Sequence, residues 1–481
     1  MTERPVTAAP GAVQVPAIPA RLEPDAIGVG QDTIIGVSNS APAATMALVL
    51  AGLAAATAYA SGLAIVVCAA AMLVIANCYR RLNLWNANCG ASFEWTGRVI
   101  NPYLGFMTGW LMIAANLVGS IAAAVVLAPS VLDIFGASAT STWPNILIAT
   151  AVIVIMVVIA VVGIRPTART QVGLAVIEYA ILIGFSVAGL VAVLGHHHGT
   201  YPITSGWFSV SGVGGQGSFT AGLLIAVFLF AGWDGTIYVN EEVKHRRINP
   251  GRAAVFAVAI LGVIYLLAQV GLQGVVSPAK LQANSSSALV YVAQALGGSG
   301  WAKVMALSLA LSVSSSVGLG IVVLARITYG MAGRRVLPQV LGVVNPRWST
   351  PAIGTIIIGV VLVAATWAYL LSAGVANLFT QLIDITGLLF ASYYILTALT
   401  VVVYYRRRVV KSAWDALITG ILPLAASGFL IWIVVQSLQS APWSQRWSVI
   451  GIVCAGLLLM FVARVVMRSP FFQIPRESAS E

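Results

Sequence analysis

The first long apolar segment of the chain is interrupted at its middle by Gly36-Val37-Ser38-Asn39-Ser40-Ala41-Pro42. Glycine, serine and asparagine are poor helix formers, and the proline that follows them has no amide hydrogen for a helical bond. A second stretch, Ala231-Gly232-Trp233-Asp234-Gly235-Thr236, places two glycines around a carboxylate in a later apolar segment. The two stretches predict two helices that unwind at mid-length.

The composition shows in which surroundings these helices lie. The chain has 481 residues, of which 59% are hydrophobic and 8% are charged, and its mean hydropathy is +0.95. An ordinary soluble domain carries about 25% charged residues. So much apolar sequence leaves no polar surface for water, which excludes a soluble enzyme, a disordered protein and a nucleic-acid binder. The sequence predicts an all-α polytopic membrane protein surrounded by lipid.

The helices can be counted because a membrane-spanning helix needs about 20 mainly apolar residues. Cutting the chain at its charge clusters and at its Pro- and Gly-rich stretches predicts twelve transmembrane helices, and the interrupted ones are the first and the sixth. The predicted spans are 26–52, 54–77, 102–132, 144–163, 171–195, 219–243, 253–276, 301–327, 351–371, 378–404, 414–437 and 447–466.

The basic residues predict the orientation, because cytoplasmic loops retain Lys and Arg. With both termini inside, 22 of the 25 Lys and Arg residues fall in cytoplasmic segments, and Lys280, Lys303 and Arg446 remain outside. We therefore expect a multi-pass protein of the cell membrane. It has a disordered cytoplasmic N-terminal tail (1–25), an extracellular loop (196–218) and a cytoplasmic C-terminal tail (469–481).

Unwound backbone survives at membrane depth only where protein buries it or where it faces a wet cavity. Interrupted helices at corresponding positions of two halves indicate an inverted-repeat transporter with a central site. The predicted repeats are 26–195 and 219–404, followed by two extra C-terminal helices in 405–468. A proline kink combined with glycine packing is the alternative interpretation.

Four motifs, in order along the chain, resemble those of the amino acid/polyamine/organocation (APC) permease superfamily. They lie between the second and third spans, at the start of the fifth, around the sixth, and between the eighth and ninth. They read GASFEWTGR (90–98) with NPYLGF (101–106) and GW (109–110); GIRPTAR (163–169); FLFAGWD (228–234) with EEVK (241–244) and NPGRA (249–253); and AR (325–326) with YGMA (329–332), LP (337–338) and TP (350–351).

The resemblance implies a LeuT-type 5+5 inverted repeat and secondary transport of amino acids or related amines. It implies that substrate is bound at both breaks, the carboxylate by backbone amides around the first and the amine by carbonyls around the second. The implied binding residues are Val37, Ser38, Asn39, Ser40 and Ala41, together with Phe230, Ala231, Gly232, Trp233 and Asp234. Many members have a glycine-rich first break, so the side chains of Ser38, Asn39 and Ser40 here either replace part of the amide cradle or narrow it.

Four acidic residues, Asp32, Glu178, Asp234 and Asp384, fall inside predicted spans. A charge at the bilayer centre costs about 2.5 to 3.5 kcal/mol, so each acid needs a role. Glu178 stands where some superfamily members carry a lysine facing the first break, and we expect it to couple transport to protons. A structural hydrogen bond is the alternative. For Asp234, pairing with a substrate ammonium competes with capping of the following half-helix.

Three further expectations concern the surroundings of the breaks. Ser315 and Ser316 in the eighth helix are a candidate ion site, although small polar residues also allow close helix packing. Trp233, Tyr393 and Tyr394 are candidate gates that stack over a ligand.

The sequence thus predicts a secondary transporter that imports amino acids by alternating access, coupled to protons or, as the alternative, to sodium. A polyamine or organic-cation transporter or exchanger is the main rival, and a transporter-like sensor or a channel is another. No G-x-S-x-G, H-E-x-x-H or P-loop motif occurs, so we expect no enzyme, catalytic residue, cofactor or metal site and no nucleic-acid partner.

Overall fold

The structure is a computed structural model that describes residues 21–135, 142–197, 199–210, 213, 218–372, 375–408 and 411–477, the side chains of 286 and 375–381 excepted. Most of the predicted N-terminal tail, part of the predicted 196–218 loop and the last four residues of the C-terminal tail lie outside the described residues. The described part of that C-terminal tail packs on the bundle, where the Phe471 ring stacks on Phe93 with centroids 4.3 Å apart.

The described chain is almost entirely helical, and two isolated β-bridges are its only extended pairings. The helices are α1 (Val29–Asn39), α2 (Pro42–Thr57), α3 (Ser61–Trp85), α4 (Ser92–Val99), α5 (Pro102–Phe135), α6 (Thr142–Val162), α7 (Ile164–Leu194), α8 (Phe219–Phe228), α9 (Gly235–Tyr238), α10 (Asn249–Gln273), α11 (Pro278–Ala283), α12 (Ala288–Gly333), α13 (Ala352–Ser372), α14 (Val375–Tyr404), α15 (Ala413–Ala416), α16 (Leu422–Ser440) and α17 (Trp443–Phe461).

Within the described residues, eleven helical segments are long and apolar enough to cross a membrane, and α1 with α2 forms the first of them. The sixth predicted span, 219–243, is not among the eleven because its helix stops at Phe228. The predicted count of twelve is therefore not confirmed as twelve continuous helices. The predicted eighth span is the second part of α12, which turns at Gly297 and Gly298, where the backbone is not helical.

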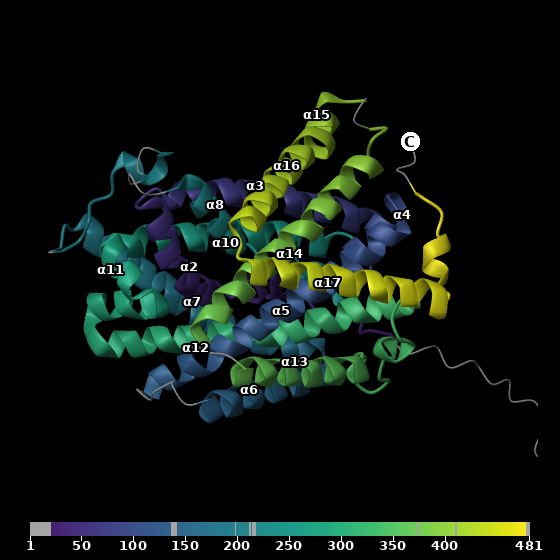
Figure 1. Cartoon of the computed structure of the whole chain (residues 1–481), viewed down its shortest axis with the longest axis horizontal. Helices are drawn as coiled ribbons and strands as arrows, with labels where there is room; N and C mark the ends of the chain where they lie inside the picture. Colours follow the sequence, from purple (N-terminus) through teal and green to yellow (C-terminus); the bar gives the residue numbers. More distant parts are fainter. Residues whose placement is uncertain are drawn as a thin grey trace, which may run out of the picture.

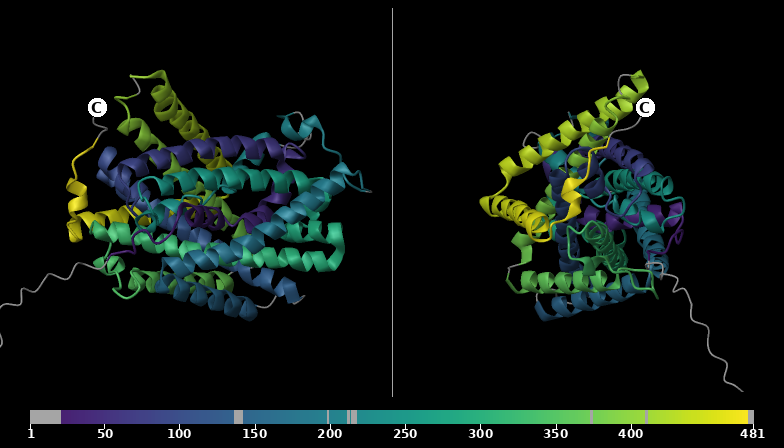
Figure 2. Two further views of the ribbon diagram at one scale, coloured as in Figure 1. Left: turned by 180° about the vertical axis from the view of Figure 1, so that it is seen from behind. Right: turned by 90° about the vertical axis from the view of Figure 1, so that its right-hand side faces the viewer.

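Most helices run along the long axis of the molecule, with α6 and α13 side by side at one edge and α16 and α17 on the outside (Figures 1 and 2). In the most apolar stretch of α1–α2, 78% of the residues are buried, against 11% in α17. The two pieces of the first broken helix thus lie in the protein interior, and α17 faces the surroundings.

Small residues bring the inner helices close together. A Cβ atom built on Gly189 of α7 would lie 2.3 Å from the Gly271 carbonyl oxygen of α10, and one built on Gly271 would lie 2.2 Å from the Ser186 carbonyl oxygen. Close backbone approach through small residues is the usual way in which membrane helices associate.

The end of the bundle that carries α4 is closed by polar contacts and holds both described ends of the chain. The segment before α1 pairs with the segment after α9, since Ala26 N–H donates to the Glu242 carbonyl (2.8 Å) and Lys244 N–H donates to the Ile27 carbonyl (2.9 Å). The Glu242 carboxylate accepts two hydrogen bonds of 3.0 Å from the Arg326 guanidinium of α12, and both side chains are fully buried. At the other terminus, Glu477 pairs with Arg98 of α4.

Candidate functional site

The first break lies where the sequence predicts it. Helix α1 ends at Asn39, and α2 begins at Pro42, whose missing amide hydrogen suits the first helical position. Between them, Ala41 has a φ of +47°, so the chain turns there through the left-handed region. The two half-helices therefore point a carbonyl end and an amide end into the same gap.

The second break is also confirmed. Helix α8 ends at Phe228, turns follow over 229–234, and α9 begins at Gly235. Gly232 has a φ of +100°, a conformation open to glycine but not to residues with a side chain. Its carbonyl accepts a hydrogen bond of 2.7 Å from Asn39 Nδ2, so the two breaks meet directly.

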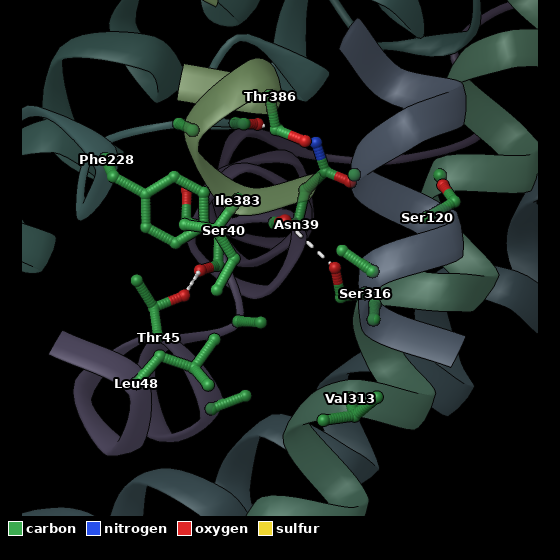
Figure 3. A pocket seen from close by; sticks show the side chains of 18 of the residues that line it. Asn39, Ser40, Thr45, Leu48, Ser120, Phe228, Val313, Ser316, Ile383 and Thr386 are labelled. Carbon is green, nitrogen blue, oxygen red and sulfur yellow. Dashed lines mark hydrogen bonds between the residues drawn. The ribbon is translucent and has the colours of Figure 1, made fainter. Parts of the chain in front are cut away.

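A pocket lies where the breaks meet, between α5, α12 and α14 (Figure 3). None of its lining residues carries a charged side chain. The polar ones are a carboxamide pair and hydroxyls: Asn39, Ser40, Thr45, Asn116, Ser120, Ser316 and Thr386. The others are Ala41, Ala44, Leu48, Gly119, Ala122, Ala123, Val126, Phe228, Ala231, Gly232, Val313, Gly320, Ile383 and Phe390.

The pocket brings together five of the ten predicted binding residues, and the binding role of all ten stays a prediction. Asn39, Ser40, Ala41, Ala231 and Gly232 line it. The lining does not include Val37, Ser38, Phe230, Trp233 or Asp234, which are buried elsewhere in the packing.

The Asp234 carboxylate is enclosed by three tyrosines. It accepts hydrogen bonds from the hydroxyls of Tyr238 (2.5 Å), Tyr393 (2.7 Å) and Tyr394 (2.9 Å), and all four side chains are fully or almost fully buried. Trp233 stacks on Tyr394 with ring centroids 5.3 Å apart. In this conformation the predicted gates Trp233, Tyr393 and Tyr394 therefore pack around Asp234 and do not line the pocket.

Asp234→Asn is expected to lower the free energy of unfolding by about 1.5 to 3 kcal/mol. The reason is that an amide nitrogen cannot accept the hydrogen bonds that the tyrosine hydroxyls donate to the carboxylate. Denaturant titration in detergent measures the loss. Tyr238→Phe removes one of the three hydrogen bonds and is the control with a smaller loss. An Asp234→Asn protein of unchanged stability that no longer binds ligand would instead place this carboxylate on the substrate.

The side chain of Glu178, a residue of α7, contacts the start of α2 beside the first break. Its Oε1 accepts a hydrogen bond of 3.2 Å from Ala43 N–H. The Oε2 atom is buried and has no partner among the described residues. The resemblance places Glu178 opposite the first break, and the structure has it in contact with that break.

The two serines of the candidate ion site, Ser315 and Ser316, lie in different surroundings. Ser316 lines the pocket and donates a hydrogen bond of 3.2 Å to the Asn39 carbonyl. Ser315 is fully buried and bonds the Gln171 side chain of α7. Ser312, one helical turn earlier on α12, contacts the first break instead, where its Oγ accepts from Ala44 N–H at 3.3 Å.

Sequence reasoning missed the contribution of α5 to the pocket, and on α14 it predicted gates at Tyr393 and Tyr394, which do not line the pocket. Asn116 and Ser120 stand one turn apart on α5, and Thr386 stands on α14. The spacing of two polar residues four apart in a mostly apolar helix was an available signal, since such residues lie on one helix face. Phe228 and Phe390, which line the pocket, were likewise not among the predicted gates.

A second cavity adjoins the pocket on the side away from α4. Leu48, Phe228 and Ile383 line both cavities and thus stand between them. The second cavity also includes Asp384 of α14, which is exposed, and Gln445 of α17. Asp32 of α1 belongs to neither cavity, and its fully buried carboxylate has no partner among the described residues.

Comparisons with known proteins agree with this fold. A sequence model described as "Amino acid permease" matches residues 29–463. The methylthioribose transporter of Bacillus subtilis (strain 168) is 23% identical over 444 residues, which cover 87% of this chain and 86% of that protein. The low-affinity putrescine importer PlaP of Escherichia coli (strain K12) is 26% identical over 305 residues, covering 61% and 64%.

Among solved structures, MhsT in complex with L-phenylalanine is similar, with a TM-score of 0.61 at 16% identity over 86% of this chain and 99% of that one. A manganese transporter of Eremococcus coleocola has a TM-score of 0.57 at 12% identity over 92% and 94%. The fold is thus of the LeuT type, as the sequence motifs predict. The matched length of 29–463 covers nearly all of the chain, and the protein belongs to the amino acid permease family.

Proposed function

We propose that the protein is a proton-coupled secondary transporter that imports an amino acid, or an amine derived from one, by alternating access. The observation that carries the proposal is the pocket at the meeting point of two broken helices, since unwound backbone buried at mid-depth serves as a substrate site in transporters of this architecture. The family and the two transporter relatives, with methylthioribose and putrescine in their names, support a small organic solute.

The α4 end is proposed to be cytoplasmic, because the predicted inner loops carry most of the Lys and Arg residues. In that orientation the polar contacts that close the α4 end form the inner barrier. The cavity shared through Leu48, Phe228 and Ile383 then lies on the outer side. Solute enters the pocket from outside while the inner barrier is shut.

Coupling to protons is proposed to reside in Glu178. Its Oε2 has no hydrogen-bond donor among the described residues, so a proton can bind there without breaking an existing bond. Its Oε1 contacts the start of α2, so a change of protonation alters the bonding of a half-helix that borders the pocket. A buried acid in a membrane helix is the usual element of a proton relay.

Accumulation in proteoliposomes tests the proposal. Vesicles with an alkaline interior are offered labelled ornithine or putrescine, with empty vesicles and a protonophore as controls. A gradient of two pH units drives up to about 100-fold accumulation for one proton per solute. We expect the labelled solute to reach a higher concentration inside the vesicles than outside. Binding without accumulation would indicate a sensor, and flux that never exceeds equilibrium would indicate a channel or uniporter.

Glu178→Gln is expected to abolish the proton-driven part of accumulation, a loss of up to about 100-fold under the same gradient. The glutamine amide oxygen still accepts the Ala43 N–H, so the start of α2 keeps its contact, but the side chain no longer binds a proton. Exchange of labelled for unlabelled solute, which needs no gradient, is expected to continue. Proton-driven accumulation at the wild-type level would remove Glu178 from the coupling step.

A further inference from the structure

The amide groups at the first break all have partners inside the protein. Amino-acid binding at such a break needs free N–H groups for the substrate carboxylate. Pro42 has none, and each neighbouring amide is already donated within the chain. Three of these N–H groups donate to backbone carbonyls: Ser40 to Val37 (3.2 Å), Ala41 to Ser38 (3.0 Å) and Thr45 to Ala41 (2.8 Å). The other two donate to side chains: Ala43 to Glu178 Oε1 (3.2 Å) and Ala44 to Ser312 Oγ (3.3 Å).

Glu178 is therefore a resident carboxyl group at the start of α2. This helix has 16 residues, so its first turn carries the partial positive charge that attracts anions. The carboxyl group of Glu178 occupies this position in the protein itself. The side chains of Glu178 and Ser312 are both fully buried beside the first turn of α2. A substrate carboxylate would have to displace them and would meet a second carboxyl at close range.

The segment that follows α8 presents a carbonyl group to the same region without such a partner. Helix α8 ends at Phe228, and helix C-termini carry a partial negative charge. At the end of α1, by contrast, the carbonyls of Val37, Ser38 and Asn39 already accept hydrogen bonds within the protein. The carbonyl oxygen of Ala231, which lines the pocket, accepts no hydrogen bond from a described backbone or side-chain group. This oxygen suits a ligand that donates hydrogen bonds.

The side chains around the pocket point to the same ligand class. Among the described residues no lysine or arginine lines the pocket, so none of them offers a positive side chain to a carboxylate. The hydroxyls of Ser40, Ser120 and Thr386 can accept hydrogen bonds from an ammonium group. In the adjoining outer cavity the charged lining residue is Asp384, which attracts cations.

We propose that the transported solute is an organic amine without a carboxylate, a cation held by the Ala231 carbonyl that follows α8 and by the hydroxyls that line the pocket. The proposal rests on the transport function proposed above and chooses between its two solute classes. Glu178 and Ser312 exclude amino acids by occupying the two amides at the start of α2 that their carboxylate needs. An amine that lacks the carboxylate keeps the carbonyl and hydroxyl contacts and loses nothing.

Matched pairs that differ only in a carboxylate test this choice. Purified full-length protein in detergent is titrated with putrescine and ornithine, agmatine and arginine, and isoamylamine and leucine, with methylthioribose as a neutral compound. We expect at least one amine to bind, and each binding amine to do so about tenfold or more tightly than its amino acid, a difference of about 1.4 kcal/mol. An amino acid that matches or exceeds its amine, or binding of methylthioribose without any amine, overturns the proposal.

A variant tests the cause of the exclusion. Glu178→Ala frees the Ala43 amide and removes the resident carboxyl, so the ratio of amino-acid to amine affinity is expected to rise about tenfold or more, the worth of one hydrogen bond to a charged group. Glu178→Gln still occupies the amide and is the matched control, with a smaller rise. An unchanged ratio in a folded Glu178→Ala protein contradicts the role of Glu178, and the wild-type pairs decide the solute class even if this variant does not fold.

The binding assay separates this inference from the transport function. An amine that binds but does not accumulate in proteoliposomes supports the solute class and refutes transport. An amino acid that accumulates refutes the solute class and supports transport.

Discussion

Arg326→Ala is expected to lower the free energy of unfolding by about 3 to 5 kcal/mol, because it leaves the Glu242 carboxylate buried without its partner. Both side chains are fully buried, and two hydrogen bonds of 3.0 Å join them. The backbone of Glu242 also accepts the Ala26 amide, so the loss acts where the segments flanking α1 and α9 meet. Denaturant titration in detergent micelles measures the change.

Removing both charges is the matched control for this prediction. A double variant, Glu242→Leu with Arg326→Met, leaves no unpaired charge, and replacing a buried pair by apolar groups is often neutral. We expect it to recover most of the stability that Arg326→Ala loses. A loss below about 1 kcal/mol in the single variant would mean that water reaches Glu242 and that this end of the bundle is not closed.

Gly232→Ala is expected to reduce solute binding by about ten- to a hundredfold, since backbone strain of roughly 1 to 3 kcal/mol falls directly on the site. Gly232 has a φ of +100°, and an added Cβ atom would lie 2.9 Å from the Asn39 carbonyl oxygen. The carbonyl of Gly232 also accepts a hydrogen bond of 2.7 Å from Asn39 Nδ2. Relief of the strain must therefore separate the two breaks.

Gly184→Ala on α7 is the control for Gly232→Ala. Gly184 is helical, and a Cβ atom there would meet nothing within 4 Å. Alanine is the better helix former, so binding is expected to stay at the wild-type level and stability to stay equal or rise. Equal binding by both variants, measured with the tightest solute of the matched pairs, would show that the contact between the breaks does not shape the pocket.

The breaks themselves could be predicted from the sequence because their causes are local. Pro42 cannot continue the hydrogen bonding of α1, and the two glycines around Asp234 weaken the sixth predicted helix wherever the rest of the chain lies. Glu178 could be placed opposite the first break from the motif at the start of its helix. The breaks depend on residue type, whereas the placement of Glu178 rests on the resemblance to the APC permeases.

The orientation of side chains within the breaks could not be predicted in this way. Asp234 turns toward three tyrosines and away from the pocket, and two of these tyrosines come from a helix about 160 residues later in the chain. A segment without helical bonds has no fixed periodicity, so its residues cannot be assigned to faces. The spacing of Asn116 and Ser120 marks one face of α5, but the cavity that this face lines depends on how α5 packs against α12.

Substrate-driven proton movement is the most direct measurement of the central claim. Proteoliposomes that contain a pH-sensitive dye receive putrescine outside, with no imposed gradient, and the internal pH is followed. We predict acidification that depends on the protein, follows putrescine entry and is absent with Glu178→Gln. Entry of the same amount of putrescine at constant internal pH would contradict proton-coupled transport through Glu178.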